Sequence, residues 1–345
     1  MKSAKLMPFQ VDNGSAVEKY RQVVDGVVDA IRRGKIRRGD QLPSVSVLYQ
    51  EFGLAKETVI KAYAILRERG VVCTIPRKGY FAATESVEHK TNVMLLFDEF
   101  PAYKQTVYDS FMERLGGRAH VDIYFHHCTP ALFEKLLLDN IALYDLAVVM
   151  PFADPAVGQV LTQVDPRKIL ILDRREHAGK GFSFIAQEFE ESVGNCLESA
   201  RDLLRKYETF YLVLPLQAEV AIRSSQAPAE IADGFKRFCR RHRLPCKVIG
   251  SLDGHAARKG EAFLVIDDTD LVAAVEMARS RGLELGKDMG ILSYNESPVK
   301  RVIDKGITVI STDFAEQGRQ AADYVLTLRP IKEILPTTLI RRQSL

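Results

Sequence analysis

The amino-acid sequence predicts an α/β protein in two parts: a small helical head that ends in a β-hairpin, and a larger, doubly wound α/β body with two lobes. Three observations support this prediction. Helical periodicity and turn residues dominate the first 85 residues, whereas short apolar runs alternate with amphipathic stretches from residue 92 onward. The chain of 345 residues is also too long for the head alone.

The first predicted helix carries apolar residues from Tyr20 to Ile31 at a spacing of 3.6 residues. Ser15 and Glu18, three residues apart, form a capping-box pattern at its start. We expect this helix to be mostly scaffold. The basic run after it, which ends at Arg38, is either a solvated helix end or a phosphate contact.

Residues 41–63 predict two short helices separated by a tight turn. Ser44 is suited to cap the first helix, and Gly53 provides the permissive backbone of the turn. The second helix is expected from Lys56 to Arg69, without a good cap because Ala55 precedes it. This pattern is a helix-turn-helix, whose second helix enters the major groove of DNA.

The β-branched run after Gly70 and the segment up to Phe81 predict a hairpin with Arg77 and Lys78 at its tip. A hairpin directly after a recognition helix is a wing, and basic residues at its tip are suited to phosphates or a minor groove. The residues expected at DNA are Ser44, Ser46, Lys56, Glu57, Thr58, Lys61, Arg77, Lys78 and Gly79.

The charge distribution agrees with a head that meets phosphate. Residues 1–90 hold 16 Lys and Arg against 10 Asp and Glu, a net charge of +6, while the remainder of the chain holds 32 against 35, a net charge of −3. A basic head on a mildly acidic body is expected if the head alone binds nucleic acid.

Residues 19–81 resemble the winged-helix domain of GntR-type transcriptional regulators. The resemblance rests on motifs in the expected order, among them Gly39 to Ser44, Lys61-Ala62-Tyr63 and Lys78 to Phe81. Ser46 stands where such proteins often carry an arginine, and a second arginine of the pattern, two residues after Thr58, is absent. The resemblance implies a DNA-binding role.

A polar segment without periodicity follows the hairpin. We therefore divide the chain into a DNA-binding domain (1–85), a linker (86–91) and a body (92–345). In the body, apolar runs predict strands at 93–97, 121–125, 146–150, 169–172, 210–214, 247–249, 263–266, 290–292 and 308–310. Helices are expected at 107–115, 133–140, 189–207, 229–242, 271–281 and 314–328.

This number of βαβ units exceeds what one sheet usually holds, so we expect two lobes with crossings near Ala186 and Ser311. The body resembles the effector-binding domain of LacI-type repressors, itself similar to periplasmic sugar-binding proteins. The resemblance rests on Ile171 to Arg174, Gly234-Phe235 and Val265 to Asp268, with looser matches after them. It implies a periplasmic-binding-protein-like fold with a sugar site between the lobes.

Polar residues at the carboxyl ends of the predicted strands are the candidate ligand contacts, because ligands of open α/β sheets bind there. A sugar site needs carboxylates or amides, a donor and an aromatic face. Asp98 and Asp267 lie at such ends. The resembled family carries an arginine that this chain does not match, and Arg223 is the candidate to take its place. The residues expected to contact the ligand are Phe97, Phe100, Tyr103, Asp173, Arg174, Arg223, Asp268 and Asn295.

Other classes of protein find little support. No window has the roughly 18 apolar residues of a membrane span, and the amino terminus lacks the apolar run of a signal peptide, so we expect a cytoplasmic protein. The five cysteines lack disulfide or zinc-site spacing, and His126 and His127 cannot both face one metal from a strand. Catalytic motifs are absent, and we expect no metal, cofactor or enzymatic activity.

The sequence therefore predicts a homodimeric repressor, similar in domain plan to GntR-type arabinose repressors, that binds a palindromic DNA operator and responds to a monosaccharide. A neutral pentose or deoxyhexose is favoured as the effector. Two alternatives stay open: a body that binds a purine or a phosphorylated sugar, and an enzyme fused to a DNA-binding head, as in aminotransferase-like GntR proteins, which would show the absorbance of pyridoxal phosphate.

Overall fold

The computed structural model describes residues 9–12, 14–15, 17–84, 90–214 and 228–345. The chain divides into two compact units, Met1–Lys90 and Thr91–Leu345. None of the described helices is long and apolar enough to cross a membrane.

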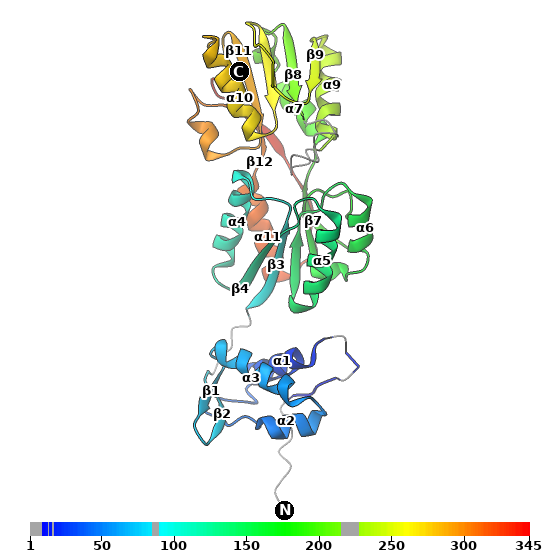
Figure 1. The fold of residues 1–345 in the computed structure, drawn as a ribbon, viewed down its shortest axis with the longest axis vertical. Coiled ribbons are helices and arrows are strands. Elements are labelled where there is room, and N and C mark those ends of the chain that lie inside the picture. The colour runs from blue at the N-terminus through cyan, green and yellow to red at the C-terminus, as the bar shows by residue number, and fades with distance from the viewer. Residues whose placement is uncertain (1–8, 13, 16, 85–89, 215–227) are drawn as a thin grey trace, which may run out of the picture. The chain divides into compact units, whose positions relative to one another are not determined.

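The first unit is a three-helix head with a hairpin (Figure 1). Its elements are α1 (Lys19–Arg32), α2 (Val45–Phe52), α3 (Lys56–Glu68), β1 (Val72–Ile75) and β2 (Gly79–Ala82). The buried faces of α1 and α3 pack against each other around residues such as Val27, Val59 and Leu66. Amphipathic spacing dictates this packing, because the apolar stripe of each helix must be buried.

The expected start of α1 is wrong. The helix begins at Lys19, and Glu18 precedes it without a capping side-chain hydrogen bond. The hydroxyl of Ser15 accepts a hydrogen bond from the backbone N–H of Val17 instead. Gln22 reaches back to the carbonyl oxygens of Asp12 and Val17, so a glutamine within the helix fixes the entering chain.

The second unit contains two six-stranded sheets with the same strand order in their parallel parts. Lobe 1 holds β13-β7-β6-β5-β3-β4 and is parallel throughout. Lobe 2 holds β14-β12-β11-β10-β8-β9, in which only β14 is antiparallel to its neighbour. The expected doubly wound α/β fold is confirmed, and the two lobes share an architecture that no sequence repeat shows.

The bounds of the strands are β3 (Thr91–Phe97), β4 (Ala119–Phe125), β5 (Leu146–Val149), β6 (Ile169–Asp173), β7 (Ser183–Gln187), β8 (Thr209–Val213), β9 (Cys246–Ile249), β10 (Glu261–Val265), β11 (Met289–Tyr294), β12 (Thr308–Thr312), β13 (Lys332–Leu335) and β14 (Thr337–Ile340). The helices are α4 (Ala102–Leu115), α5 (Pro130–Asn140), α6 (Pro155–Leu161), α7 (Glu190–Ser199), α8 (Arg201–Leu204), α9 (Glu230–His242), α10 (Asp268–Ser280) and α11 (Phe314–Thr327). Short 3-10 turns lie at η1 (Ile141–Leu143), η2 (Pro166–Lys168) and η3 (Pro298–Arg301).

Helices cover both faces of each sheet, which explains why central strands such as β5 and β10 are buried along their whole length (Figure 1). On β3, Val93 and Leu95 contact the cluster under α4 and α11, while Met94 and Leu96 contact the cluster under α5 and α6. In lobe 2, α7 and α9 cover one face and α10 the other.

The chain crosses between the lobes three times rather than twice. It leaves lobe 1 after Gln187, returns between Thr312 and Phe314, and leaves again between Leu335 and Thr337. The first two crossings lie at the expected places. The third was not expected, because β13 and β14 are short edge strands with alternating or polar residues that give little signal.

Candidate functional site

The helix-turn-helix of the head forms around the expected signals. The side chain of Ser44 accepts a hydrogen bond of 3.3 Å from the backbone N–H of Val47 and so caps α2. Gly53 ends that helix in the left-handed conformation, with a φ of 63°. Ala55 precedes α3 and gives it no capping bond, so packing of Val59 and Leu66 holds that helix.

The hairpin contacts α3 and the segment that precedes α2. Strands β1 and β2 pair from Val72 with Ala82 to Ile75 with Gly79. The rings of Tyr63 in α3 and Tyr80 in β2 stack with centroids 4.2 Å apart. The side-chain amide of Gln41 donates a hydrogen bond of 2.6 Å to the carbonyl of Lys78. These two contacts fix the position of the wing relative to α3.

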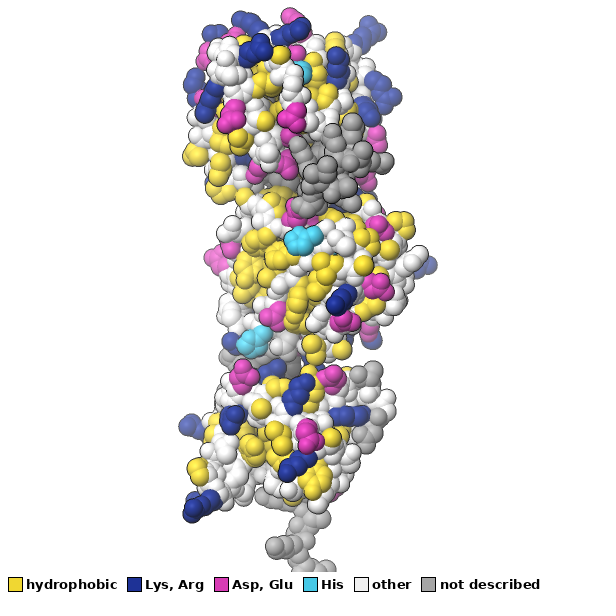
Figure 2. Space-filling model, in the orientation of Figure 1, with side chains coloured by type: hydrophobic (Ala, Val, Ile, Leu, Met, Phe, Trp, Pro, Cys, Tyr) yellow, Lys and Arg dark blue, Asp and Glu magenta, His cyan; other side chains and the backbone are white. Residues whose placement is uncertain are grey.

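The nine residues expected at DNA lie on α2, α3 and the hairpin or next to them, and most of them are exposed. Thr58 and Gly79 are half-buried. Arg77 takes the left-handed conformation, with a φ of 63°, and both it and Lys78 are exposed at the hairpin turn. Lys61 differs in one respect, since its ammonium lies 3.8 Å from the centre of the Tyr20 ring. Figure 2 shows basic side chains spread over the head.

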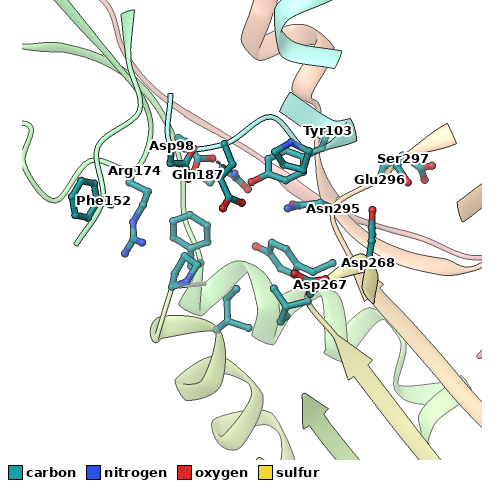
Figure 3. A pocket seen from close by; sticks show the side chains of 18 of the residues that line it. Asp98, Tyr103, Phe152, Arg174, Gln187, Asp267, Asp268, Asn295, Glu296 and Ser297 are labelled. Atoms are coloured by element: carbon teal, nitrogen blue, oxygen red, sulfur yellow. Dashed lines mark hydrogen bonds between the residues drawn. The ribbon is translucent and has the colours of Figure 1, made fainter. Parts of the chain in front are cut away.

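A cavity of about 180 Å³ lies at the carboxyl ends of the strands of both lobes in the second unit. Figure 3 shows side chains from both sheets converging on it. Its lining includes Asp98, Glu99, Tyr103, Phe152, Asp173, Arg174, Gln187, Phe189, Asp267, Asp268, Tyr294, Asn295, Glu296, Ser297 and Lys300. Ligand pockets commonly measure ~300–1,000 Å³, so this volume favours a small ligand.

Five of the eight expected ligand contacts line this cavity: Tyr103, Asp173, Arg174, Asp268 and Asn295. Phe97 does not, because it points into the core beneath α4 and is 1% exposed. Phe100 lies outside the cavity lining, 40% exposed, with its ring packed on Tyr108 and Phe125. Arg223 lies outside the described residues.

Asp173 and Asn295 share an unusual backbone. Each follows or ends a parallel strand and takes the left-handed conformation, with φ of 71° and 61° respectively. For residues other than glycine this conformation costs about 1–3 kcal/mol and clusters at ligand sites. Both residues line the cavity.

A chain of hydrogen bonds links Asp173 to all three crossings, and we call it the hinge network. The side-chain amide of Gln187 donates to the Asp173 carboxylate. The Gln187 carbonyl oxygen accepts from the Thr312 hydroxyl at 2.8 Å, and Thr312 lies 2.8 Å from the hydroxyl of Thr337. Because Gln187, Thr312 and Thr337 stand one on each crossing, the network joins the ligand cavity to the hinge.

A buried ion pair supports the lobe 1 side of the cavity. Lys104, in the first turn of α4, is 3% exposed and pairs with Asp98. Burial alone would raise the pKa of Asp98, but the charge of Lys104 lowers it overall. Burial raises the pKa of Asp173, and the charge of Lys104 opposes that shift only in part.

The lobe 2 side of the cavity is held by Lys300 and Glu296. The Lys300 ammonium pairs with Asp268 at 2.8 Å and donates to the carbonyls of Tyr294 and Asn295 at 2.8 and 2.7 Å. Asp268, with a side chain 57% exposed, is therefore a tether to this loop as well as a ligand candidate. Arg342, near the carboxyl end of the chain, fixes Glu296 at 2.6 Å.

The aromatic wall includes a residue that sequence reasoning missed. Phe152 follows β5, and the neighbouring histidines hold it: His126 stacks on its ring at 5.1 Å, and His177 bonds its carbonyl at 2.9 Å. His126 is fully buried, and burial lowers its pKa. Its Nδ1 accepts from the backbone N–H of Cys128, so Nε2 donates to the carbonyl of Met150.

A winged helix-turn-helix joined to a two-lobed α/β body with a polar cleft is the architecture of a transcriptional regulator with a ligand-sensing domain. The family described as bacterial regulatory proteins, gntR family, matches residues 19–81. The periplasmic binding protein-like domain matches residues 205–345.

Two relatives agree with this class. The HTH-type transcriptional repressor YtrA of Bacillus subtilis is 30% identical over 90 residues, which are 25% of this chain and 69% of YtrA. The mannosyl-D-glycerate transport/metabolism system repressor MngR of Escherichia coli is 35% identical over 129 residues, which are 37% of this chain and 46% of MngR. The match therefore spans about half of MngR. The chain belongs to the gntR family of bacterial regulatory proteins.

Solved structures show the fold of the body. The trehalose repressor from Escherichia coli has a TM-score of 0.59 and 16% identity, with 73% of this chain and 100% of that chain covered. A LacI family transcriptional regulator from Lactobacillus casei with bound glucose has a TM-score of 0.61 and 14% identity, with 74% and 99% covered. The body thus has the fold of LacI-type regulators.

Proposed function

We propose that this protein is a transcriptional repressor whose operator binding is controlled by a monosaccharide held between its two lobes. The carrying observation is the polar cavity at the strand ends of both lobes, where Asp173 and Asn295 hold strained backbones. The glucose complex of the Lactobacillus casei neighbour supports a sugar in this fold. The volume of about 180 Å³ supports one ring rather than several.

In this proposal the head binds DNA through α3 and the wing. Lys56 and Glu57 lie exposed at the start of α3, where a recognition helix meets base edges. Arg77 and Lys78 are suited to phosphates. One recognition helix reads few base pairs, so a homodimer on a palindromic operator is proposed. Such a protein works in the compartment that holds the chromosome, the cytoplasm.

The sugar acts by favouring the closed arrangement of the lobes. Asp173 ends a strand of lobe 1, whereas Asp268 opens α10 of lobe 2. A ligand that bridges them shifts the equilibrium by its differential affinity for the closed state, and ~1–3 kcal/mol of coupling changes operator affinity about 5- to 150-fold. A phosphorylated sugar finds less support, since the described residues that line the cavity include six carboxylates and two basic side chains. The proposal includes no cofactor and no catalysis.

The test begins with an operator selected from random DNA by the full chain. Its affinity is then measured with and without monosaccharides over a range of salt. Arg77→Ala should weaken binding to all sequences and flatten the salt dependence by about one unit of log–log slope. The exposed body residue Arg167 gives the matched control, Arg167→Ala, which should change neither.

The response to sugar is tested with Asp173→Ala, and Asp139→Ala, at an exposed residue, is the control. We expect Asp173→Ala to keep operator affinity in the absence of sugar and to lose the response to sugar. A full sugar response in this variant would place the ligand elsewhere. A chain that responds to no monosaccharide but to a purine or a sugar phosphate would contradict the proposed effector class.

A further inference from the structure

The cavity between the lobes is strongly acidic. Six carboxylates line it, from Asp98, Glu99, Asp173, Asp267, Asp268 and Glu296. Among the described residues, Arg174 and Lys300 alone bring positive charge to the lining. A neutral sugar requires hydrogen-bonding groups but no such excess of charge. The net charge of the cavity therefore depends on which of these carboxylates already have a positively charged partner in the protein.

The basic side chains at the cavity already bind partners within the protein. An ammonium has three N–H donors, and those of Lys300 are directed at Asp268 and the carbonyls of Tyr294 and Asn295. Arg174 pairs with Glu176 at 2.7 Å. Lys104, beside the cavity, pairs with Asp98. Glu296 has Arg301 and Arg342 as partners.

Three of the carboxylates have no ion-pair partner among the described residues: Glu99, Asp173 and Asp267. Asp173 accepts a hydrogen bond from Gln187, and Asp267 caps α10 by accepting from the backbone N–H of Thr269 at 2.7 Å. Glu99 differs from these two residues, because its Oε1 is buried without any hydrogen-bond partner in the described part of the chain. Burial raises the pKa of Glu99, and the nearby charges of Asp98 and Asp267 raise it further.

A second, independent observation points to a polar ligand at the same place. The phenol oxygen of Tyr294, whose side chain is 98% buried, has no hydrogen-bond partner among the described residues. The side-chain oxygen of Asn295 is likewise buried and unpaired within that part of the chain. Both residues line the cavity. Buried polar atoms normally have a hydrogen-bond partner, so we expect a ligand to donate hydrogen bonds to these two oxygens.

We propose that the sugar bound here is an amino sugar, and that its protonated amino group lies between the carboxylates of Glu99 in lobe 1 and Asp267 in lobe 2. This inference rests on the proposed function and names the chemical class of its effector. Glu99 follows β3 of lobe 1, and Asp267 follows β10 of lobe 2, so each lies beyond the carboxyl end of a parallel strand, and both line the cavity.

The placement gives the amine a direct part in lobe closure. Two carboxylates that approach across a cleft repel each other, and a cation between them replaces this repulsion with two charge-assisted hydrogen bonds. The neutral parent sugar leaves the repulsion in place. An inorganic cation is a poorer fit, because no three His, Cys, Asp or Glu side chains of the described residues form a metal-binding group.

The experiment measures binding of hexoses, hexosamines and N-acetylhexosamines to the full chain by titration calorimetry near neutral pH. Glucose, galactose and mannose each have a matched amine and a matched acetamide, so charge changes while the ring is kept. We expect one hexosamine to bind at least about tenfold more tightly than its parent and its N-acetyl form.

Two variants locate the amine. Glu99→Gln and Asp267→Asn should each reduce the ratio of hexosamine to hexose affinity several-fold. The control Glu276→Gln, on the exposed face of α10, should leave the ratio unchanged. Unfolding temperatures of all variants identify any that fail to fold, and for those the other variant decides.

Each outcome has a distinct meaning. A parent hexose that binds as tightly as its amine overturns the amino group but leaves the proposed sugar site intact. Failure of the whole panel to bind overturns the proposed function as well. Unchanged ratios in both variants place the amine elsewhere. Stabilisation by Ca²⁺ or Mg²⁺ alone that Glu99→Gln removes would identify an inorganic cation instead and overturn the inference.

Discussion

Lys104 carries a positive charge into the interior of lobe 1. Its side chain is 3% exposed, and burial by itself would lower its pKa. The neighbouring Tyr103, Asp98 and Asp173 reverse this effect and raise the pKa overall. The ammonium thus stays protonated at neutral pH, pairs with Asp98 and acts on Asp173 through its charge.

We expect Lys104→Met to lower the free energy of unfolding by about 3 kcal/mol at pH 7, because removal of one partner leaves a buried carboxylate unpaired. The pKa of Asp98 is lowered in the folded protein. The pair's contribution is therefore present above the unfolded pKa of about 4 and is lost as pH falls through the folded value.

Urea unfolding at pH 7 and pH 3 tests this prediction. The difference between Lys104→Met and the unaltered protein should be large at pH 7 and smaller at pH 3. The exposed pair of Arg167 and Asp165 provides the control, and Arg167→Met should change stability little. Equal unfolding free energies for Lys104→Met and the unaltered protein at pH 7 would show that the ion pair is not stabilising.

Among elements, α11 packs directly on α4 in lobe 1. Gly318 of α11 lies against α4, and a Cβ added there would come within 2.2 Å of the carbonyl oxygen of Val107. Backbone atoms cannot give way as a flexible side chain can. Lobe 2 has a similar close contact at a glycine, since a Cβ on Gly234 of α9 would meet the carbonyl oxygen of Glu190 at 2.3 Å.

Gly318→Ala should therefore destabilise the body by about 1–3 kcal/mol, the usual cost of overpacking. Gly194→Ala in α7 is the matched control, because the nearest contact there is the flexible guanidinium of Arg237 at 3.8 Å. That change should stabilise by roughly 0.5–1 kcal/mol, the helix preference for alanine over glycine. Thermal unfolding of both variants checks the signs, and a neutral Gly318→Ala would contradict the close approach.

The sequence predicts those elements whose residues repeat an apolar period. Strands β3, β6 and β10 and helices α3, α9 and α11 appear within a few residues of the expected positions. Strand β7 (Ser183–Gln187) and helix α6 were missed. The first is polar at both ends, and the second is short, with Gly158 in its middle.

The site could be predicted only in part. Asp173 and Asn295 were found because they follow recognisable strands. Gln187 and Lys300 were not, since their role depends on the crossings and on the loop after β11, which tertiary structure assembles. Phe97 was misplaced because it is the last residue of the strand, and side-chain alternation directs it into the same core cluster as Val93 and Leu95.

At the scale of the whole molecule, the hinge network joins the ligand cavity to the three crossings. Ligand binding and lobe closure can therefore each affect it. Thr312→Val keeps the shape of the side chain but removes the hydroxyl that joins Gln187 and Thr337. We expect a loss of about 1–2 kcal/mol in stability. The half-maximal sugar concentration for the operator response should also change, because Asp173 and Gln187 lose their link to the other two crossings.

Operator binding measured over a range of sugar concentrations tests this coupling. Thr338→Val is the control, since Thr338 is the next residue along the same strand and its hydroxyl bonds only weakly, at 3.5 Å, to the carbonyl of Ser311. If both variants respond to sugar as the unaltered protein does, the network has no part in the response. A changed response in Thr312→Val alone assigns the coupling to the network.

The three crossings also govern the order in which the protein can be completed during translation. Lobe 1 consists of residues 91–187 and 314–335, so α11 and β13 leave the ribosome only after nearly all of lobe 2. Until then the α4 face that α11 covers, with Val107 and Phe111, has no partner. The nascent chain therefore exposes an apolar surface for most of its synthesis, and this surface is where a chaperone would bind.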